Sequence, residues 1–230
     1  MFSQFDFNVI ERSWHYLFFT GMTFTLQLTV LAMGGGIVIG TLLAMARLSS
    51  IRLLSVPAGA YVNVMRGIPL ILVIFWFYFL VPYIGQWLTG SSQPIKVGAF
   101  ASCLVTFILF EACYYCEIMR AGIQSISRGQ VAAGYALGLD YWQCMGRVVL
   151  PQAFRNMAPL LLTQTIVLFQ DVSLVYVLSM PDFLGAASKV AQRDGRLVEM
   201  YTFVALVYFV MSYALSSMVK SLQSRIAIVR

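Results

Sequence analysis

The chain has 230 residues, of which 60% are apolar and only 10% are charged, and its mean hydropathy is +0.82. A soluble domain is about 45–50% apolar and about 25% charged, so this composition excludes a water-soluble globular protein and indicates an integral membrane protein. The net charge of +6 suits the inner face of a membrane and does not call for nucleic acid as a partner.

Five apolar segments are long enough to cross the hydrocarbon core, which takes about 20 residues of helix. They cover about 17–46, 58–81, 97–119, 157–180 and 200–219. We expect an all-α membrane protein in which residues 1–230 form a single transmembrane domain. An odd number of crossings places the two termini on opposite sides of the membrane.

The positions of Lys and Arg predict the direction of these crossings, because basic residues gather on the cytoplasmic side. With the N-terminus outside, five basic residues lie outside: Arg12, Lys96, Lys189, Arg193 and Arg196. The cytoplasmic side then holds the other ten: Arg47, Arg52, Arg66, Arg120, Arg128, Arg147, Arg155, Lys220, Arg225 and Arg230. The sequence therefore predicts an N-terminus on the outside and a C-terminus in the cytoplasm.

Within the first segment, small residues recur at every fourth position: Ala32, Gly36, Gly40 and Ala44. Small residues at this spacing line one face of a helix and let another helix approach closely, so the pattern predicts a packing seam, within the chain or with a partner. Pro69 and Pro82 are expected to bend or end the second segment. Pro159 is expected in the first turn of the fourth segment, where proline is tolerated.

The stretch at about 120–156, between the third and fourth segments, is far longer than a plain connection needs. Its apolar residues follow a helical period, which is interrupted near Gly138. Asp140 is expected to cap a second short helix, and Leu150-Pro151 to separate that helix from the next crossing. The periodic positions are Val131, Tyr135, Leu139, Trp142, Met145 and Val149.

Two short cytoplasmic helices with exposed apolar side chains can be interpreted in two ways. They either rest on the lipid surface or dock into another protein. Helices that rest on lipid usually carry Lys and Arg along the polar face, whereas this stretch has basic residues only near its ends, at Arg128 and Arg147. The sequence favours docking into a protein.

The stretch GQVAAGYALGLDYWQCMGRVVLPQAFR, residues 129–155, resembles the EAA loop of ATP-binding-cassette importer permeases. That loop follows the pattern EAA, three residues, G, nine residues, I, one residue, LP. Ala132 and Gly134 depart from it, in place of Glu and the second Ala, while the spacing is intact. The resemblance implies that these residues couple the chain to an ATPase: Gly129, Gln130, Ala132, Ala133, Gly134, Gly138, Leu139, Leu150 and Pro151.

Three further stretches are similar to segments of polar amino acid permeases: CEIMRAGIQSISRGQ (116–130), MRGIPLILVIFWFYF (65–79) and LFQDVSLVYVL (168–178). The resemblance runs from about residue 15 to 220 and is nearest to glutamate/aspartate importer permeases. It implies a type I importer permease fold with a cytoplasmic coupling loop, in a bacterial inner membrane. It also implies a two-copy ATPase that binds ATP and magnesium, a second permease subunit in a heterodimeric or homodimeric pore, and a periplasmic solute-binding protein.

Ionisable side chains deep in a membrane are costly and mark functional candidates, and two acids are expected at membrane depth, Glu111 and Asp171. Gln164 lies two helical turns before Asp171 on the same face, and Ser173 is nearby. These residues form either a solute path, in which Asp171 receives a substrate ammonium group, or contacts with a partner permease. Glu111 is expected to serve packing. The side chain of Arg66 is expected to extend to the cytoplasmic surface of the membrane or to form a structural ion pair. The alternative is that Arg66 binds a substrate carboxylate.

The chain shows no sign of enzymatic chemistry of its own. It lacks the GxxxxGK[ST] phosphate-binding motif, so ATP must bind to a separate chain. Cys113 and Cys116 form a CxxC without a second pair or a nearby histidine, so neither a metal site nor catalytic residues are expected. A stand-alone ion-coupled carrier or channel remains the alternative function, but it would call for inverted repeats or several intramembrane charges, and the five segments contain no convincing internal repeat.

Overall fold

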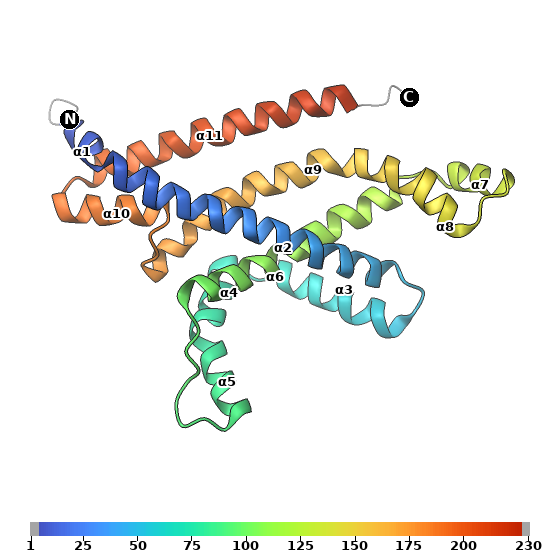
Figure 1. The fold of residues 1–230 in the computed structure, drawn as a ribbon, viewed down its shortest axis with the longest axis horizontal. Helices are drawn as coiled ribbons and strands as arrows, with labels where there is room; N and C mark the ends of the chain where they lie inside the picture. Colours follow the sequence, from blue (N-terminus) through green and yellow to red (C-terminus); the bar gives the residue numbers. More distant parts are fainter. Residues whose placement is uncertain (1–4, 227–230) are drawn as a thin grey trace.

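The computed structural model describes residues 5–226, and this part of the chain is helical, with no strand. Four long helices lie roughly along the long axis of the molecule, and the shorter helices lie at its ends and on one side (Figure 1). The long helices are α2 (Thr23–Leu48), α6 (Ala99–Gln124), α9 (Leu150–Asp171) and α11 (Leu197–Ile226).

Five helical segments have the length and composition to cross a membrane, which confirms the predicted number. They are Asn8–Leu48, Leu70–Thr89, Ala99–Gln124, Tyr141–Leu178 and Leu197–Arg225. The first combines α1 (Asn8–His15), a π-helical segment (Tyr16–Met22) and α2 without interruption. The fourth likewise joins four helical pieces into one rod.

The second segment, expected as one helix over 58–81, is divided in two. Helix α3 (Arg52–Arg66) ends at Gly67, and α4 (Leu70–Phe75) begins after Pro69. Proline has no N–H to donate and forces an extended conformation on the residue before it, Ile68. A π-helical segment (Trp76–Leu80) and α5 (Val81–Thr89) follow, with Pro82 in the first turn of α5.

The expected position of Pro159 is wrong. Proline stands inside α9 rather than in its first turn, because this helix already begins at Leu150. The carbonyl of Pro159 accepts a hydrogen bond from the hydroxyl of Thr163 at 2.9 Å. A bond from a Thr hydroxyl to the carbonyl four residues earlier is common within helices and often accompanies a slight bend.

The predicted seam of small residues is confirmed, and it lies within the chain. Ala32 and Ala44 are fully buried, and α2 packs along α6 more extensively than any other pair of elements. A Cβ atom on Gly40 would lie 2.8 Å from the Cβ of Tyr115 and 2.9 Å from the carbonyl oxygen of Ala112. The two helix backbones are therefore in direct contact at Gly40.

The end of the molecule near the N-terminus is closed by α10 (Phe183–Asp194), whose N-cap is the buried Asp182. The Asp182 carboxylate accepts from the backbone N–H groups of Leu184 and Gly185, and the hydroxyl of Thr25 on α2 accepts from that of Phe183 at 3.0 Å. Burial raises the pKa of Asp182 to about 7, against these N–H donors, which favour the charged carboxylate.

Gly40→Ala is expected to destabilise the chain, because the new methyl group overlaps Tyr115 and Ala112. Overpacking of a tight contact costs about 1–3 kcal/mol. Gly34→Ala is the matched control, since a Cβ at this position meets nothing within 4 Å. The thermal unfolding midpoint in detergent should fall for Gly40→Ala alone, and equal midpoints for both variants would contradict the direct backbone contact.

Candidate functional site

The stretch at 120–156 forms a pair of short helices that projects from the end of the long axis (Figure 1). Helix α7 (Arg128–Ala136) is followed by Gly138 at φ +80° and by α8 (Tyr141–Cys144). Asp140 caps α8 through a capping box with Gln143, whose N–H donates to the Asp140 carboxylate at 2.8 Å. The predicted interruption at Gly138 and the predicted cap are both confirmed. We call residues 128–149 the helix pair.

The expected separation at Leu150-Pro151 is wrong. Helix α8 continues through a π-helical turn (Met145–Val149) directly into α9. Pro151 occupies the first turn of α9, where its missing N–H and fixed φ are tolerated. One unbroken helical rod therefore runs from the helix pair through the segment Tyr141–Leu178.

The two short helices touch at Gly134, the buried residue of α7. A Cβ on Gly134 would lie 2.9 Å from the sulfur of Cys144 on α8, and Cys144 is itself buried. The thiol of Cys144 points back at the carbonyl of Val131, at 3.8 Å. Gly134, one of the departures from the EAA pattern, thus provides the space that Cys144 fills.

Side-chain hydrogen bonds fix the helix pair to the body. The amide nitrogen of Gln152 donates to the side-chain oxygen of Gln130 at 2.7 Å. The amide nitrogen of Asn156 on α9 donates to the hydroxyl of Ser125 at the end of α6 at 2.8 Å. Both bonds join α9 to the chain around α7, so the pair is braced at its base.

The predicted apolar face is divided between the inside and the outside of the helix pair. Val149 is buried and Val131, Leu139 and Met145 are half-buried, so these side chains serve the internal packing. The exposed apolar residues are Tyr135, Leu137, Tyr141 and Trp142. Leu137 and Trp142, at 83% and 78% exposure, have almost no contact with the rest of the chain.

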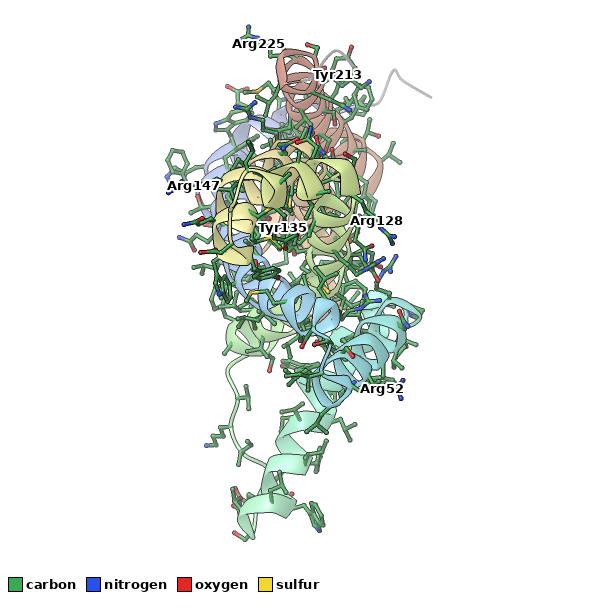
Figure 2. The ribbon with its side chains drawn as sticks, turned by 90° about the vertical axis from the view of Figure 1, so that its right-hand side faces the viewer. Arg52, Arg128, Tyr135, Arg147, Tyr213 and Arg225 are labelled. Atoms are coloured by element: carbon green, nitrogen blue, oxygen red, sulfur yellow. The ribbon has the colours of Figure 1, made fainter. Side chains whose placement is uncertain are left out.

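Figure 2 looks onto this end of the molecule, with Tyr135 near the centre and Arg128 and Arg147 on opposite sides. The coupling positions proposed from the sequence lie mainly on its surface. Gly134 is buried and Leu139 half-buried, and the exposed positions are Gly129, Gln130, Ala132, Ala133, Gly138, Leu150 and Pro151. The end surface is therefore apolar at its centre and basic at its edges.

A second group of polar residues lies between α6 and α9. Glu111 is fully buried, and its Oε2 accepts a hydrogen bond from the amide nitrogen of Gln164 at 3.0 Å. Its Oε1 has no hydrogen-bond partner in the described part of the chain. One turn on, the hydroxyls of Tyr115 and Thr165 lie 3.1 Å apart. Glu111 is therefore buried between α6 and α9 with one carboxylate oxygen uncommitted.

Asp171 lies seven residues beyond Gln164, about 10 Å along the helix axis. It is half-buried, as is Ser173 in the 3₁₀ turn (Val172–Leu178) that follows. Gln164 and Asp171 lie on one side of α9, as the helical spacing indicates, and Glu111 of α6 meets that side at Gln164.

Arg66 pairs with Glu117, an acid that was not among the two expected inside the membrane segments. Its guanidinium lies 3.3 Å from Oε1 of Glu117 and 5.4 Å from the centre of the Tyr114 ring. Glu117 also pairs with Arg47 from α2 and with Arg120 at 2.8 Å. Glu117 is a third acid within 97–119, and its spacing from Arg120 was the available signal.

Glu117→Gln is expected to loosen the ends of α2 and α3 from α6, because three guanidinium groups lose their shared carboxylate. Each hydrogen bond to a charged group contributes about 1.5–3 kcal/mol to the free energy of unfolding. Because the cluster is partly exposed, the loss of stability is expected at the lower end of this range. Thermal unfolding in detergent measures it. Glu11→Gln is the control, since Glu11 is exposed and forms no ion pair within residues 5–226. Equal midpoints would contradict the role of Glu117.

Comparisons with known proteins agree with this architecture. Residues 36–228 match the family described as binding-protein-dependent transport system inner membrane component. The chain is 52% identical to the glutamate/aspartate import permease protein GltK of Escherichia coli O6:H1, over 97% of this chain and 99% of that protein. It is 30% identical to the glutamine transport system permease protein GlnP of Escherichia coli K12, over 98% and 99%.

Among solved structures, an amino acid ABC transporter crystallised with histidines is similar at a TM-score of 0.85 and 30% identity, over 96% of this chain and 98% of that one. The inward-facing MetNI methionine ABC transporter is similar in fold, at a TM-score of 0.68 and 18% identity. The expected type I importer permease fold is confirmed. The chain belongs to the family of binding-protein-dependent transport system inner membrane components.

Proposed function

We propose that the chain is one permease subunit of a bacterial inner-membrane importer that moves glutamate or aspartate into the cell. The helix pair carries this proposal, because it is a rigid, braced projection whose centre is exposed and apolar. Similarity to a glutamate/aspartate import permease at 52% identity over 97% of this chain supports the substrate class. The excess of basic residues around the helix pair supports a cytoplasmic location for it, with the N-terminus in the periplasm.

ATP and magnesium would bind to a separate two-copy ATPase, since the chain has no phosphate-binding motif of its own. A periplasmic binding protein would deliver the amino acid, and a second, different permease would complete the pore. The ATPase is proposed to seat Leu137 and Trp142 in an apolar groove. Because Ala132 stands in the place of the usual glutamate, apolar packing rather than an ion pair is proposed to hold this contact.

The unbroken rod Tyr141–Leu178 suggests how the force is transmitted. Motion of α8 passes into α9 without a flexible joint and reaches Gln164 and Asp171 on the same rod. A rigid element of this kind can switch a pore between two states by rocking as a body. ATP-driven closure of the ATPase is proposed to rock α9 and thereby alternate access to the substrate.

The solute path is proposed to run along Asp171, Ser173, Gln164 and Glu111. Asp171 would hold the ammonium group of the amino acid, because an acidic side chain repels the carboxylates at the other end of the substrate. The guanidinium of Arg66 lies over the ring of Tyr114, three residues beyond Glu111 on the same helix. The Arg66 side chain pairs with Glu117 but remains 41% exposed, and it is proposed to meet a substrate carboxylate.

Gly138→Val is expected to uncouple the chain from the ATPase. A β-branched residue at φ +80° is a conformational outlier, so the turn between α7 and α8 must change. The ATPase that copurifies with the detergent-solubilised complex should decrease several-fold. Gly59→Val is the control, because Gly59 lies in the neighbouring helix α3 without a positive φ and without a close neighbour. Normal ATPase binding and transport by Gly138→Val would refute the docking role.

Asp171→Asn is expected to reduce the uptake of radiolabelled glutamate at low substrate concentration by about ten- to hundred-fold, the equivalent of one charged hydrogen bond of about 1.5–3 kcal/mol. Asp171→Glu keeps the charge and should retain part of the activity. ATPase copurification should be unchanged in both variants. Unaltered uptake by Asp171→Asn would remove Asp171 from the solute path.

A further inference from the structure

Helices α9 and α11 are tied together at Gln170. Its amide nitrogen donates to the hydroxyl of Ser212 on α11 at 2.9 Å, and the rings of Phe169 and Tyr208 lie 5.2 Å apart. From this contact α11 continues in the direction of the helix pair (Figure 1), and no residue at 213–225 is buried. The second half of α11 therefore lacks close packing against the rest of the chain.

A groove of about 470 Å³ lies between α2, α9 and α11 in this region. It is lined by side chains at 211–222 of α11 and at 162–169 of α9. No charged side chain lines it, and the hydroxyls of Thr29 and Thr165 in its walls donate to backbone carbonyls of their own helices. The groove therefore suits a hydrocarbon rather than a polar ligand.

The length of the groove matches one leaflet of a membrane. Residues 211–222 of α11 span about 16 Å at the α-helical rise, and one leaflet contributes half of a hydrocarbon core of about 30 Å. In the orientation of the proposed function the groove lies in the cytoplasmic half, because its α11 residues precede the cytoplasmic C-terminus and its α9 residues follow the helix pair. An acyl chain of the cytoplasmic leaflet has the same position and reach.

The volume of the groove distinguishes a lipid chain from a helix of another protein. A helix is about 10 Å wide with its side chains, so a length of about 16 Å occupies about 1,250 Å³. The groove holds about 470 Å³. A partner helix can therefore rest on the groove without filling it, whereas a single extended acyl chain is thin enough to enter.

The charges near the cytoplasmic end of the groove indicate an anionic lipid. Arg155 lies two helical turns before the groove residues of α9, on the same face, and Arg225 lies one turn after those of α11. Both are exposed, and neither forms an ion pair within residues 5–226. No acidic residue occurs at 141–170 or at 200–230. Basic pockets between membrane helices on the cytoplasmic side bind anionic headgroups.

We propose that the groove binds one acyl chain of an anionic phospholipid of the cytoplasmic leaflet, with the lipid phosphate at Arg155. Arg225 adds positive charge at the same end. The acyl chain packs between α9 and α11 on the cytoplasmic side of the Gln170 contact and supplies the packing that the second half of α11 lacks. The choice of leaflet rests on the proposed function, but the binding of the lipid requires neither the ATPase nor a particular substrate.

Native mass spectrometry of the detergent-solubilised transporter tests this site. The whole complex is incubated with equal amounts of phosphatidylglycerol, which is anionic, and phosphatidylcholine, which has no net charge, and the retained lipids are counted. Leu215 lines the groove, so Leu215→Trp should fill it and reduce the retained phosphatidylglycerol several-fold. Val210→Trp is the matched control, because Val210 is exposed on the same helix, at 61%, and does not line the groove.

Arg155→Gln tests the headgroup separately from the acyl chain. The preference for phosphatidylglycerol over phosphatidylcholine should fall several-fold, while the total amount of retained lipid stays close to that of the wild type. Arg52→Gln on α3 is the control, since Arg52 is also exposed and forms no ion pair within residues 5–226. Leu222→Trp, at another lining position, replaces Leu215→Trp if that variant does not assemble.

The possible outcomes distinguish the occupants of the groove. Unchanged retention of phosphatidylglycerol in Leu215→Trp, or an equal loss in Val210→Trp, would overturn the site. Equal retention of both lipids by the wild type would overturn the anionic headgroup. Release of a second permease from Leu215→Trp, with phosphatidylglycerol retained, would show that a protein covers the groove. A wild-type chain that copurifies with no ATPase would refute the proposed function, and its retained lipids would still decide the site.

Discussion

The close approach of α2 to α6 at Gly36 and Gly40 is the contact on which the other features depend. A Cβ on Gly36 would lie 3.1 Å from the ring of Tyr115 and 3.2 Å from the Cβ of Glu111, so these two side chains are held by the backbone of α2 itself. Tyr115 and Glu111 then bond to Thr165 and Gln164 of α9. The position of α9, and with it the helix pair, is therefore fixed by a chain of contacts that starts at two glycines.

This arrangement separates a fixed part from a movable part. Helices α2 and α6 pack against each other more extensively than any other pair. Glu117 of α6 also forms ion pairs with Arg47 of α2 and Arg66 of α3. Helix α9 packs against them less extensively than they pack against each other. It meets them through buried apolar side chains such as Leu161 and Leu168 and through the hydrogen bonds of Gln164 and Thr165, and it continues into the helix pair. Polar contacts between membrane helices contribute on average about 0.6 kcal/mol, so the polar part of this interface can be exchanged at low cost. A pore that alternates between two states needs such a difference between its rigid and its adjustable interfaces.

Much of this structure follows from spacing in the sequence. The four-residue recurrence from Ala32 to Ala44 predicted the seam because a helix brings such positions to one face, and Gly138 with Asp140 predicted the turn and cap of the helix pair. The failures concern features in which neighbouring segments decide the outcome. A proline such as Pro159 is typical of the first turn of a helix. It stands inside α9 because the π-helical turn before Leu150 lets the helix continue from α8 into α9.

The pairing of Glu117 and the sideways course of α5 were not predictable from local patterns. Glu117 meets Arg47 and Arg66 only because α2, α3 and α6 end side by side, and its spacing from Arg120 indicates just one of its partners. The apolar composition of Leu70–Thr89 fits a crossing, but its direction does not follow from composition. The division at Gly67–Pro69, which separates α3 from α4, redirects the chain there.

Gly134 and Ala132 show how a familiar loop changes while keeping its geometry. Gly134 stands in place of the second alanine of the EAA pattern, on the inner side of α7. Cys144 of α8 occupies the space that the alanine methyl group would fill, so the two helices lie closer together than an alanine would allow. Ala132, on the exposed side, gives up a charge. In the proposed contact with an ATPase, both changes would replace a single ion pair by apolar packing at Leu137 and Trp142. Such packing would depend on the shape of the helix pair, which the tight contact between Gly134 and Cys144 holds constant.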